Sequence, residues 1–440
     1  MPRLRQEANK RKTSVGHLRH LAFAAALWLP LSMAAAQGDR SSGDASRAVD
    51  NIRVRGVLHF DGRRFSDDVT PGTADTWLLR RVRPTIEGTV GGVYDFRITP
   101  DFAGGRTIIL DAYVSTKLRP WAVLTAGKFK VPVGLERLQS ASDLRFIERA
   151  FPTSLVPNRD LGVQLSGDVV GGAVSYAIGY FNGVSDGSSS DSNSPNADAE
   201  NDTKGDWMAR IFLRPFARSE NPALNGLGFG IAGTYVDSTG TTDVTLLPSY
   251  RTPGQQVFFR YRGNSGAGGN ATFADGERLR YSPQFYYYYG RLGVLGEYVN
   301  VSQDVTRVNN GVARSASLDN SAWHLQLSWL ATGGKESYKA ITPAHTTGSG
   351  ALAWNAVELV ARYHELRIDS EAFDGGADSF ADPSTSARKA SAAGVGVNWY
   401  LNRNAKLSFN YEKTRFDGGA AGGADREDEE AFLMRVALSF

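Results

Sequence analysis

Apolar and polar residues alternate with a period of two along most of the chain after residue 50. The last segment is typical, and its alternate positions hold one apolar set: Phe432, Met434, Val436, Leu438 and Phe440. A period of two places one apolar and one polar face on a β-strand. The pattern therefore predicts an all-β protein.

Sixteen segments show this pattern and are separated by turn-forming clusters. They are residues 51–60, 77–88, 93–101, 108–118, 121–131, 161–168, 173–182, 206–215, 227–236, 277–289, 292–303, 320–331, 353–368, 390–401, 405–416 and 430–440. A seventeenth segment, residues 256–262, would put the two ends of an up-and-down sheet on opposite sides, so we assign it to a long loop.

Short connections alternate with long polar ones. The short ones are residues 88–92, 118–121, 167–172, 290–291 and 402–405, and the long ones are 62–76, 132–160, 182–205, 237–276, 304–319, 369–389 and 417–429. Residues 332–350 are the exception, being long where a short turn is expected. Short turns on one side and long loops on the other are typical of an outer-membrane barrel. We therefore predict a 16-stranded antiparallel transmembrane β-barrel.

Aromatic residues lie within the strands or near their ends, where they would form the two girdles of such a barrel. They are Trp77, Tyr94, Trp121, Trp207, Trp323, Trp329, Trp399 and the run Tyr286–Tyr289. A soluble β-sandwich or propeller whose rings fill a core is the alternative. Several arginines on each polar face favour a water-filled lumen, and no repeat at a fixed period supports a propeller.

The amino terminus has the features of a secretory signal. Residues 1–36 carry six basic residues and one acidic residue, and the charge-free stretch 21–36 ends in three alanines. A membrane anchor is the alternative, but the stretch is shorter than the roughly 18 residues that a helix needs to span a bilayer. We predict a signal peptide (1–36), a polar lead-in (37–50), one barrel domain (51–440) and location in the bacterial outer membrane.

Composition excludes other classes of protein. The chain of 440 residues has no Cys, which excludes disulfide scaffolds and Cys-ligated metals. Loss of residues 1–36 changes the formal charge from +3 to −2. The remaining chain is not globally basic, so we expect no nucleic-acid partner, and any preference for anions depends on where the arginines point.

Enzyme signatures are absent from the sequence. The six His show no metal-ligand spacing, and no Gly-x-Ser-x-Gly elbow, P-loop or dinucleotide fingerprint precedes a helix. We expect no enzyme activity, no cofactor and no metal. An outer-membrane hydrolase remains an alternative, because its catalytic residues could meet in space without a local motif.

Basic residues on the polar faces are the more informative set. They are Arg53, Arg55, Arg81, Arg83, Arg97, Lys128, Lys130, Arg210, Arg214, Arg278, Arg280 and Arg362. A hydrated anion must exchange water for other donors in a narrow pore, and the guanidinium fork offers paired N–H groups. Several modest sites in series allow passage without trapping. The alternative is a plain solvated lumen in which nearby carboxylates neutralise these cations.

The long connection 132–160 combines four arginines (Arg137, Arg145, Arg149, Arg159) with four carboxylates (Glu136, Asp143, Glu148, Asp160) and several apolar residues. Loops of this length are usually functional or disordered, and the apolar residues of this one favour packing. Folded into the lumen, it would narrow the pore. Ion pairs within the loop could instead make its charges structural.

Several motifs closely resemble the phosphate-selective porin O and P family. They are residues 79–83 (LRRVR), 110–113 (LDAY), 127–136 (GKFKVPVGLE), 143–150 (DLRFIERA) and 159–165 (RDLGVQL), with further likeness at 354–363 and 397–411. Phe440 is similar to the final aromatic residue of outer-membrane barrels. The likeness is strong over residues 77–182 and loose between 183 and 350.

The resemblance implies a homotrimer of sixteen-stranded barrels surrounded by outer-membrane lipids. It implies an inward-folded third loop that constricts the pore, with Lys130, Arg145 and Arg149 there, and an arginine ladder that includes Arg81 and Arg83. The small anions that pass through such a channel would be phosphate, pyrophosphate or polyphosphate. We expect a passive anion channel; a general-diffusion or differently selective porin and a plugged structural barrel are the alternatives.

Overall fold

The computed structural model describes residues 49–66, 75–105, 107–189, 204–264, 269–344 and 355–440. The predicted signal peptide (1–36) and nearly all of the lead-in (37–50) lie outside the described residues. Among the described residues, no helix has the length and apolar character that crossing a membrane requires.

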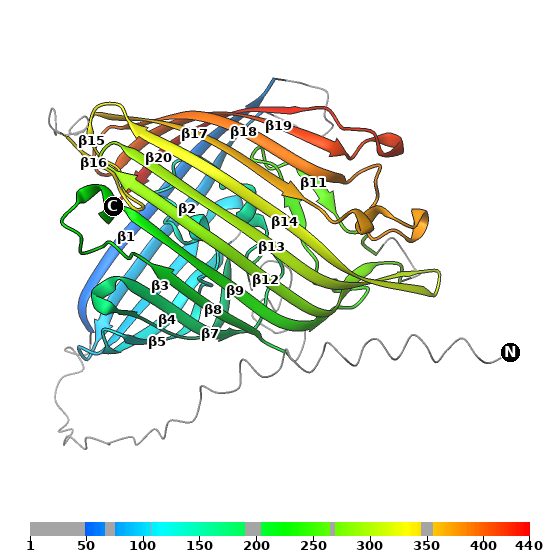
Figure 1. Cartoon of the computed structure of the whole chain (residues 1–440), viewed down its shortest axis with the longest axis horizontal. Helices are drawn as coiled ribbons and strands as arrows, with labels where there is room; N and C mark the ends of the chain where they lie inside the picture. The colour runs from blue at the N-terminus through cyan, green and yellow to red at the C-terminus, as the bar shows by residue number, and fades with distance from the viewer. Residues whose placement is uncertain (1–48, 67–74, 106, 190–203, 265–268, 345–354) are drawn as a thin grey trace, which may run out of the picture. The chain divides into compact units, whose positions relative to one another are not determined.

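Sixteen antiparallel strands form a closed barrel, in which each strand pairs with the next and β20 pairs with β1 (Figure 1). The strands are β1 (Val49–Phe65), β2 (Thr76–Val90), β3 (Tyr94–Asp101), β4 (Ile108–Arg119), β5 (Ala122–Lys130), β6 (Arg159–Val169), β7 (Val174–Phe181), β8 (Asp206–Leu213), β9 (Leu227–Thr239), β12 (Thr272–Tyr289), β13 (Leu292–Asn309), β14 (Val312–Leu330), β17 (Ala356–Arg367), β18 (Ala387–Tyr400), β19 (Ala405–Gly418) and β20 (Glu429–Ser439). Each predicted segment overlaps one of them, so the predicted sixteen-stranded barrel is confirmed.

Smaller elements lie in the connections. They include the two-stranded sheets β10 (Ser249–Arg251) with β11 (Val257–Arg260) and β15 (Gly334–Lys335) with β16 (Thr342–Pro343), the short helices α1 (Leu135–Leu138) and α2 (Pro222–Asn225), and short 3-10 helices such as η3 (Phe151–Ser154). Because β11 pairs only with β10 and not with a barrel strand, the assignment of residues 256–262 to a long loop is confirmed.

The predicted long loop at residues 304–319 is wrong. Strands β13 and β14 continue to a two-residue turn, Asn310 and Gly311, whose φ angles are 48° and 80°. Positive φ at both positions is the geometry of a type I′ hairpin turn, which Asn-Gly favours. The outward residues of this extension, such as Ser315 and Ser317, are polar, and their polarity made a strand look like a loop.

The barrel is apolar outside and polar inside. On β14 the residues Trp323, Leu325 and Leu327 are 40–49% exposed, whereas His324 and Gln326 between them are 2–3% exposed. In a closed barrel the exposed face is the outer one. An outer apolar band beside a polar interior is the pattern of a barrel in lipid.

Outward aromatic rings gather at two levels. Near the long loops they pack across neighbouring strands with centroids 4.8–5.5 Å apart: Phe60–Trp77, Tyr180–Trp207, Trp323–Tyr363 and Tyr411–Phe432. Near the short turns lie the exposed rings Tyr94, Trp121, Tyr289, Trp329 and Trp399. The run Tyr286–Tyr289 alternates, however, and Tyr286 packs on the inward ring of Phe212.

We expect Leu325→Arg to lower the free energy of unfolding by roughly 2–4 kcal/mol, the cost of a lipid-facing Arg near the bilayer midplane. Ser317→Arg, on the same face of β14 beyond the apolar band, should change it by less than about 0.5 kcal/mol. Denaturant titration of the barrel folded into vesicles measures both. Equal effects would contradict the assignment of this face to lipid.

Candidate functional site

A strongly basic cavity of about 440 Å³ lies inside the barrel beside β2, β5 and β6. Eight basic and two acidic side chains line it. The basic ones are Arg80, Arg81, Arg83, Lys130, Arg137, Arg149, Arg159 and Arg251, and the acidic ones are Glu148 and Asp186. Residues from β2, from the connection 131–158 and from the β10–β11 segment therefore meet around one positively charged space.

A β-bulge concentrates arginine on β2. His59 of β1 pairs with Arg81 and the next residue pairs with Leu79, so Arg80 is the extra residue. A bulge interrupts strict alternation. Arg80 Nε donates to Glu148 Oε1 at 2.7 Å, and Arg81 Nη1 lies 3.0 Å from His59 Nδ1. With Arg83, three guanidinium groups from four consecutive residues line the cavity.

The connection 131–158 is hydrogen-bonded to inward-facing side chains of distant strands. Side chains that donate to its carbonyls include Gln284 to Val133 (2.6 Å), Lys406 to Leu144 (2.8 Å), Asn398 to Arg145 (2.8 Å), Arg435 to Ile147 (2.8 Å) and Arg362 to Glu148 (2.7 Å). The N–H of Ile147 donates to Asn410 Oδ1 (2.8 Å). These contacts hold the connection against β12 and β17–β20.

Residues 336–339, in the described part of the long turn that follows β14, also contact this connection. Glu336 accepts from Arg145 Nη2 at 2.8 Å, and the carbonyl of Tyr338 accepts from Gln139 Nε2 at 2.7 Å. The Tyr338 hydroxyl donates to the carbonyl of Leu135 at 2.6 Å. The turn that interrupts the alternation of short and long connections therefore braces residues 135–145.

Three cavity cations have a carboxylate partner. They are Arg80 with Glu148 (2.7 Å), Arg83 with Asp101 (2.7 Å) and Arg159 with Asp111 (2.9 Å). The other five bind neutral acceptors: Arg81 contacts His59, and Lys130, Arg137, Arg149 and Arg251 donate to backbone carbonyls. No salt bridge within the described residues neutralises these five, so the cavity keeps a surplus of positive charge.

Two of these cations, Arg137 and Arg149, lie in the connection 131–158, and burial lowers their pKa values. Burial, reinforced by the neighbouring guanidinium groups of Arg149 and Arg159, lowers the pKa of Arg137 to about 9. Burial lowers the pKa of Arg149 to about 10, although Glu136 opposes the change. Both pKa values stay well above 7, so both groups are protonated at neutral pH.

The structure brings four of the predicted pore residues together at this cavity: Arg81, Arg83, Lys130 and Arg149. Arg145 lies elsewhere. Its side chain is 1% exposed and pairs with Glu336 at 2.8 Å and with Glu358 at 2.6 Å. Arg145 therefore joins the connection to the turn and to β17.

The remaining predicted residues do not line the cavity. Arg55 and Arg97 share Glu87 (2.7 Å each), and Arg53 is exposed near the start of β1. Arg278 and Arg280 pair with Asp206, Arg210 donates to Gln284, Arg214 donates to the carbonyl of Gly172, and Arg362 pairs with Glu412. Lys128 is buried, and its register partners are Ala112 and Leu161. Most of these cations are balanced locally.

Four cavity residues were not among the predicted pore residues, namely Arg80, Arg137, Arg159 and Arg251. Strict alternation places Arg80 on the face opposite Arg81. The bulge interrupts this alternation, so both side chains line the cavity. Arg137 and Arg159 were visible as charges of the long connection. Arg251 lies in the connection between β9 and β12, where no local pattern connects it with β2.

The cavity can exchange the water around an anion for N–H donors. Guanidinium groups bind oxyanions through paired hydrogen bonds, and neighbouring donors allow an anion to move from one to the next. A lining of one sign in a confined space also raises the local concentration of the opposite charge. The arrangement therefore suits the passage of anions.

Comparisons with known proteins agree with the fold. The outer membrane channel DcaP of Acinetobacter baumannii is 11% identical, with 90% of this chain and 99% of that chain covered and a TM-score of 0.55. An anion-selective porin from Comamonas acidovorans is 12% identical, with 89% and 99% covered and a TM-score of 0.51. OmpT of Vibrio cholerae in its trimer form is 12% identical, with 89% and 99% covered and a TM-score of 0.50.

No curated protein matches the sequence. The family profile described as phosphate-selective porin O and P matches residues 52–440, nearly the whole barrel. The channel of Acinetobacter baumannii and the porin of Comamonas acidovorans share this fold. This chain therefore belongs to the phosphate-selective porin O and P family, and it is a porin of the bacterial outer membrane.

Proposed function

We propose that this porin is a passive diffusion channel for small anions, with phosphate or polyphosphate preferred, and that the basic cavity is its selective step. The observation that carries the proposal is the lining of that cavity, in which eight basic side chains face two acidic ones. Membership of a family named for phosphate selectivity supports it.

We attribute the anion selectivity of this cavity to the uncharged carbonyl groups that accept hydrogen bonds from its cations. Lys130 Nζ donates to the carbonyls of Leu138 and Gln139 at 3.3 and 2.8 Å, and Arg149 Nη2 donates to the carbonyl of Gln139 at 2.9 Å. A carbonyl satisfies hydrogen bonds without cancelling the charge of the donor. The cations are thus fixed in position and remain available electrostatically, which disfavours the entry of other cations.

Phosphate gains more from this lining than chloride. At neutral pH a phosphate group carries roughly −1.5 to −2 charges and several strong acceptor oxygens. It can accept paired N–H donors from guanidinium groups, whereas a halide has no such geometry. The three arginines of residues 80–83 lie close enough in the chain to present donors to adjacent oxygens of a single polyphosphate.

The assembly we propose is a homotrimer whose outer apolar band contacts outer-membrane lipids. The likeness to OmpT, which was solved as a trimer, supports this assembly. The exposed tryptophans of the two aromatic levels, such as Trp77 and Trp121, support contact with the two membrane surfaces.

Planar bilayer recordings test the selectivity. In a potassium chloride gradient the reversal potential should have the sign of an anion-selective pore, and added phosphate should block the chloride current in a saturable way. Permeability that follows ion size alone, with no block by phosphate, would indicate a general-diffusion porin and contradict the proposal.

Replacing Lys130 or Arg149 with Ala should raise the half-blocking phosphate concentration by about tenfold, because each substitution removes one charged donor worth roughly 1.5 kcal/mol. Arg97→Ala is the matched control, since Arg97 pairs with Glu87 outside the cavity. For Arg97→Ala the half-blocking phosphate concentration should stay near that of the unmodified protein. If all three variants block at the same concentration, the cavity is not the selective step.

A further inference from the structure

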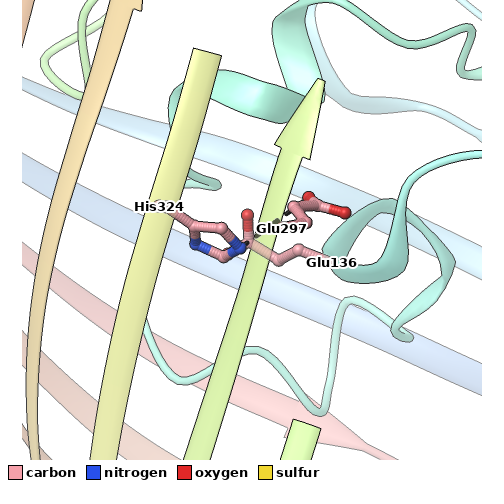
Figure 2. A group of neighbouring side chains, drawn as sticks. All are labelled: Glu136, Glu297 and His324. Atoms are coloured by element: carbon pink, nitrogen blue, oxygen red, sulfur yellow. Dashed lines mark ion pairs between the residues drawn. The ribbon is translucent and has the colours of Figure 1, made fainter. Parts of the chain in front are cut away.

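Three side chains from separate elements, none of which lines the basic cavity, converge inside the barrel. Figure 2 shows Glu136 of α1, Glu297 of β13 and His324 of β14 pointing toward one another. One possible ligand atom from each residue lies within 4.8 Å of the other two. Their exposed fractions are 1%, 4% and 2%, so bulk water does not reach them.

The histidine has no hydrogen-bond partner within the described part of the chain. Both ring nitrogens of His324 are buried and unpaired, and so is Oε1 of Glu297. His324 Nε2 and Glu297 Oε1 are 3.8 Å apart, which is too long for a hydrogen bond. Buried polar atoms are normally satisfied, and a water or an ion held between the imidazole and the carboxylate would satisfy both groups.

Glu136 shares its nearest cation with another carboxylate, and within the described residues no salt bridge joins Glu297 to an Arg or Lys. Arg362 Nη1 lies 3.8 Å from Glu136 Oε1, but Arg362 forms a shorter pair with Glu412 at 2.7 Å. His364, the cross-strand neighbour of His324, likewise contacts Glu412. Two buried carboxylates this close stay ionised together only with a cation beside them; otherwise one of them carries a proton.

We propose that Glu136, Glu297 and His324 form a binding site for one divalent transition-metal ion of the zinc type. Two carboxylate oxygens and one imidazole nitrogen are a donor set that Zn²⁺ accepts, with water as a fourth ligand. In a tetrahedral site with bonds of about 2.0–2.1 Å the ligand atoms lie roughly 3.3 Å apart. Small side-chain adjustments bring the three atoms to that separation.

The site has a structural consequence for the connection 131–158. Both carboxylates already bind its backbone: Glu136 accepts from the N–H of Ala150 at 2.8 Å, and Glu297 accepts from the N–H of Leu135. A metal ion would add a direct bond between α1 and the wall at β13 and β14. It would thereby fix Arg137 and Arg149, which line the basic cavity.

Metal titration of the full-length barrel in detergent, after removal of metals with a chelator, tests the proposal. We expect one Zn²⁺ per barrel by calorimetry, and Co²⁺ in its place should show the visible absorption bands of a low-coordinate nitrogen and oxygen site. Glu297→Gln and His324→Gln should each weaken binding by at least about tenfold, because even outer-shell changes cost that much in metal sites. His59→Gln, a buried histidine that contacts Arg81, should leave the affinity unchanged.

Two outcomes would overturn the site. If neither Zn²⁺ nor Co²⁺ binds stoichiometrically to the unmodified barrel, the carboxylates share a proton instead. If binding is the same in Glu297→Gln and His324→Gln as in the unmodified barrel, the ion lies elsewhere. The Co²⁺ spectrum of the unmodified protein decides the case even where a variant fails to fold, and it does not depend on anion selectivity.

Discussion

Hydrogen bonds from inward-facing cations to backbone carbonyls organise the interior of this barrel. A closed sheet uses its own backbone groups in the ladder, so the arginines and lysines on its inner wall must find acceptors elsewhere. The connection 131–158 supplies them, and its carbonyls accept from Lys130, Arg362, Lys406 and Arg435. The connection is thereby fixed, and a donor such as Lys130 that binds only carbonyls has no carboxylate in the described part of the chain to neutralise it.

Charge is distributed unevenly around the inner wall as a result. Beside β17 to β20, the guanidinium groups of Arg145, Arg362 and Arg435 each pair with a carboxylate at 2.6–2.7 Å. Beside β2 and β5, Arg81 and Lys130 have neutral partners only. The cations beside β17 to β20 therefore serve packing. The wall beside β2 and β5 keeps cations that no carboxylate among the described residues neutralises, and such a wall attracts anions.

Most of the fold could be predicted from the sequence because lipid imposes a strict period of two on every strand. The same rule failed where lipid no longer contacts the sheet: polar outward residues such as Ser315 concealed the extension of β13 and β14. The period of two also failed at Arg80, because a bulge depends on how two strands pair and cannot be recognised in the sequence of one strand. Glu136, Glu297 and His324 are far apart in the chain, so no ligand spacing could indicate their convergence.

The bracing turn between β14 and β17 bears on how the barrel is made. Many partners of the connection that follows β5 lie on β12 to β20 and in this turn, as the pairs Arg145–Glu336 and Ile147–Arg435 show. Contacts so distant in sequence form late, because a long chain must be closed first. The contacts that hold residues 145–147 in place are therefore completed only after the last strand, β20, has joined the sheet.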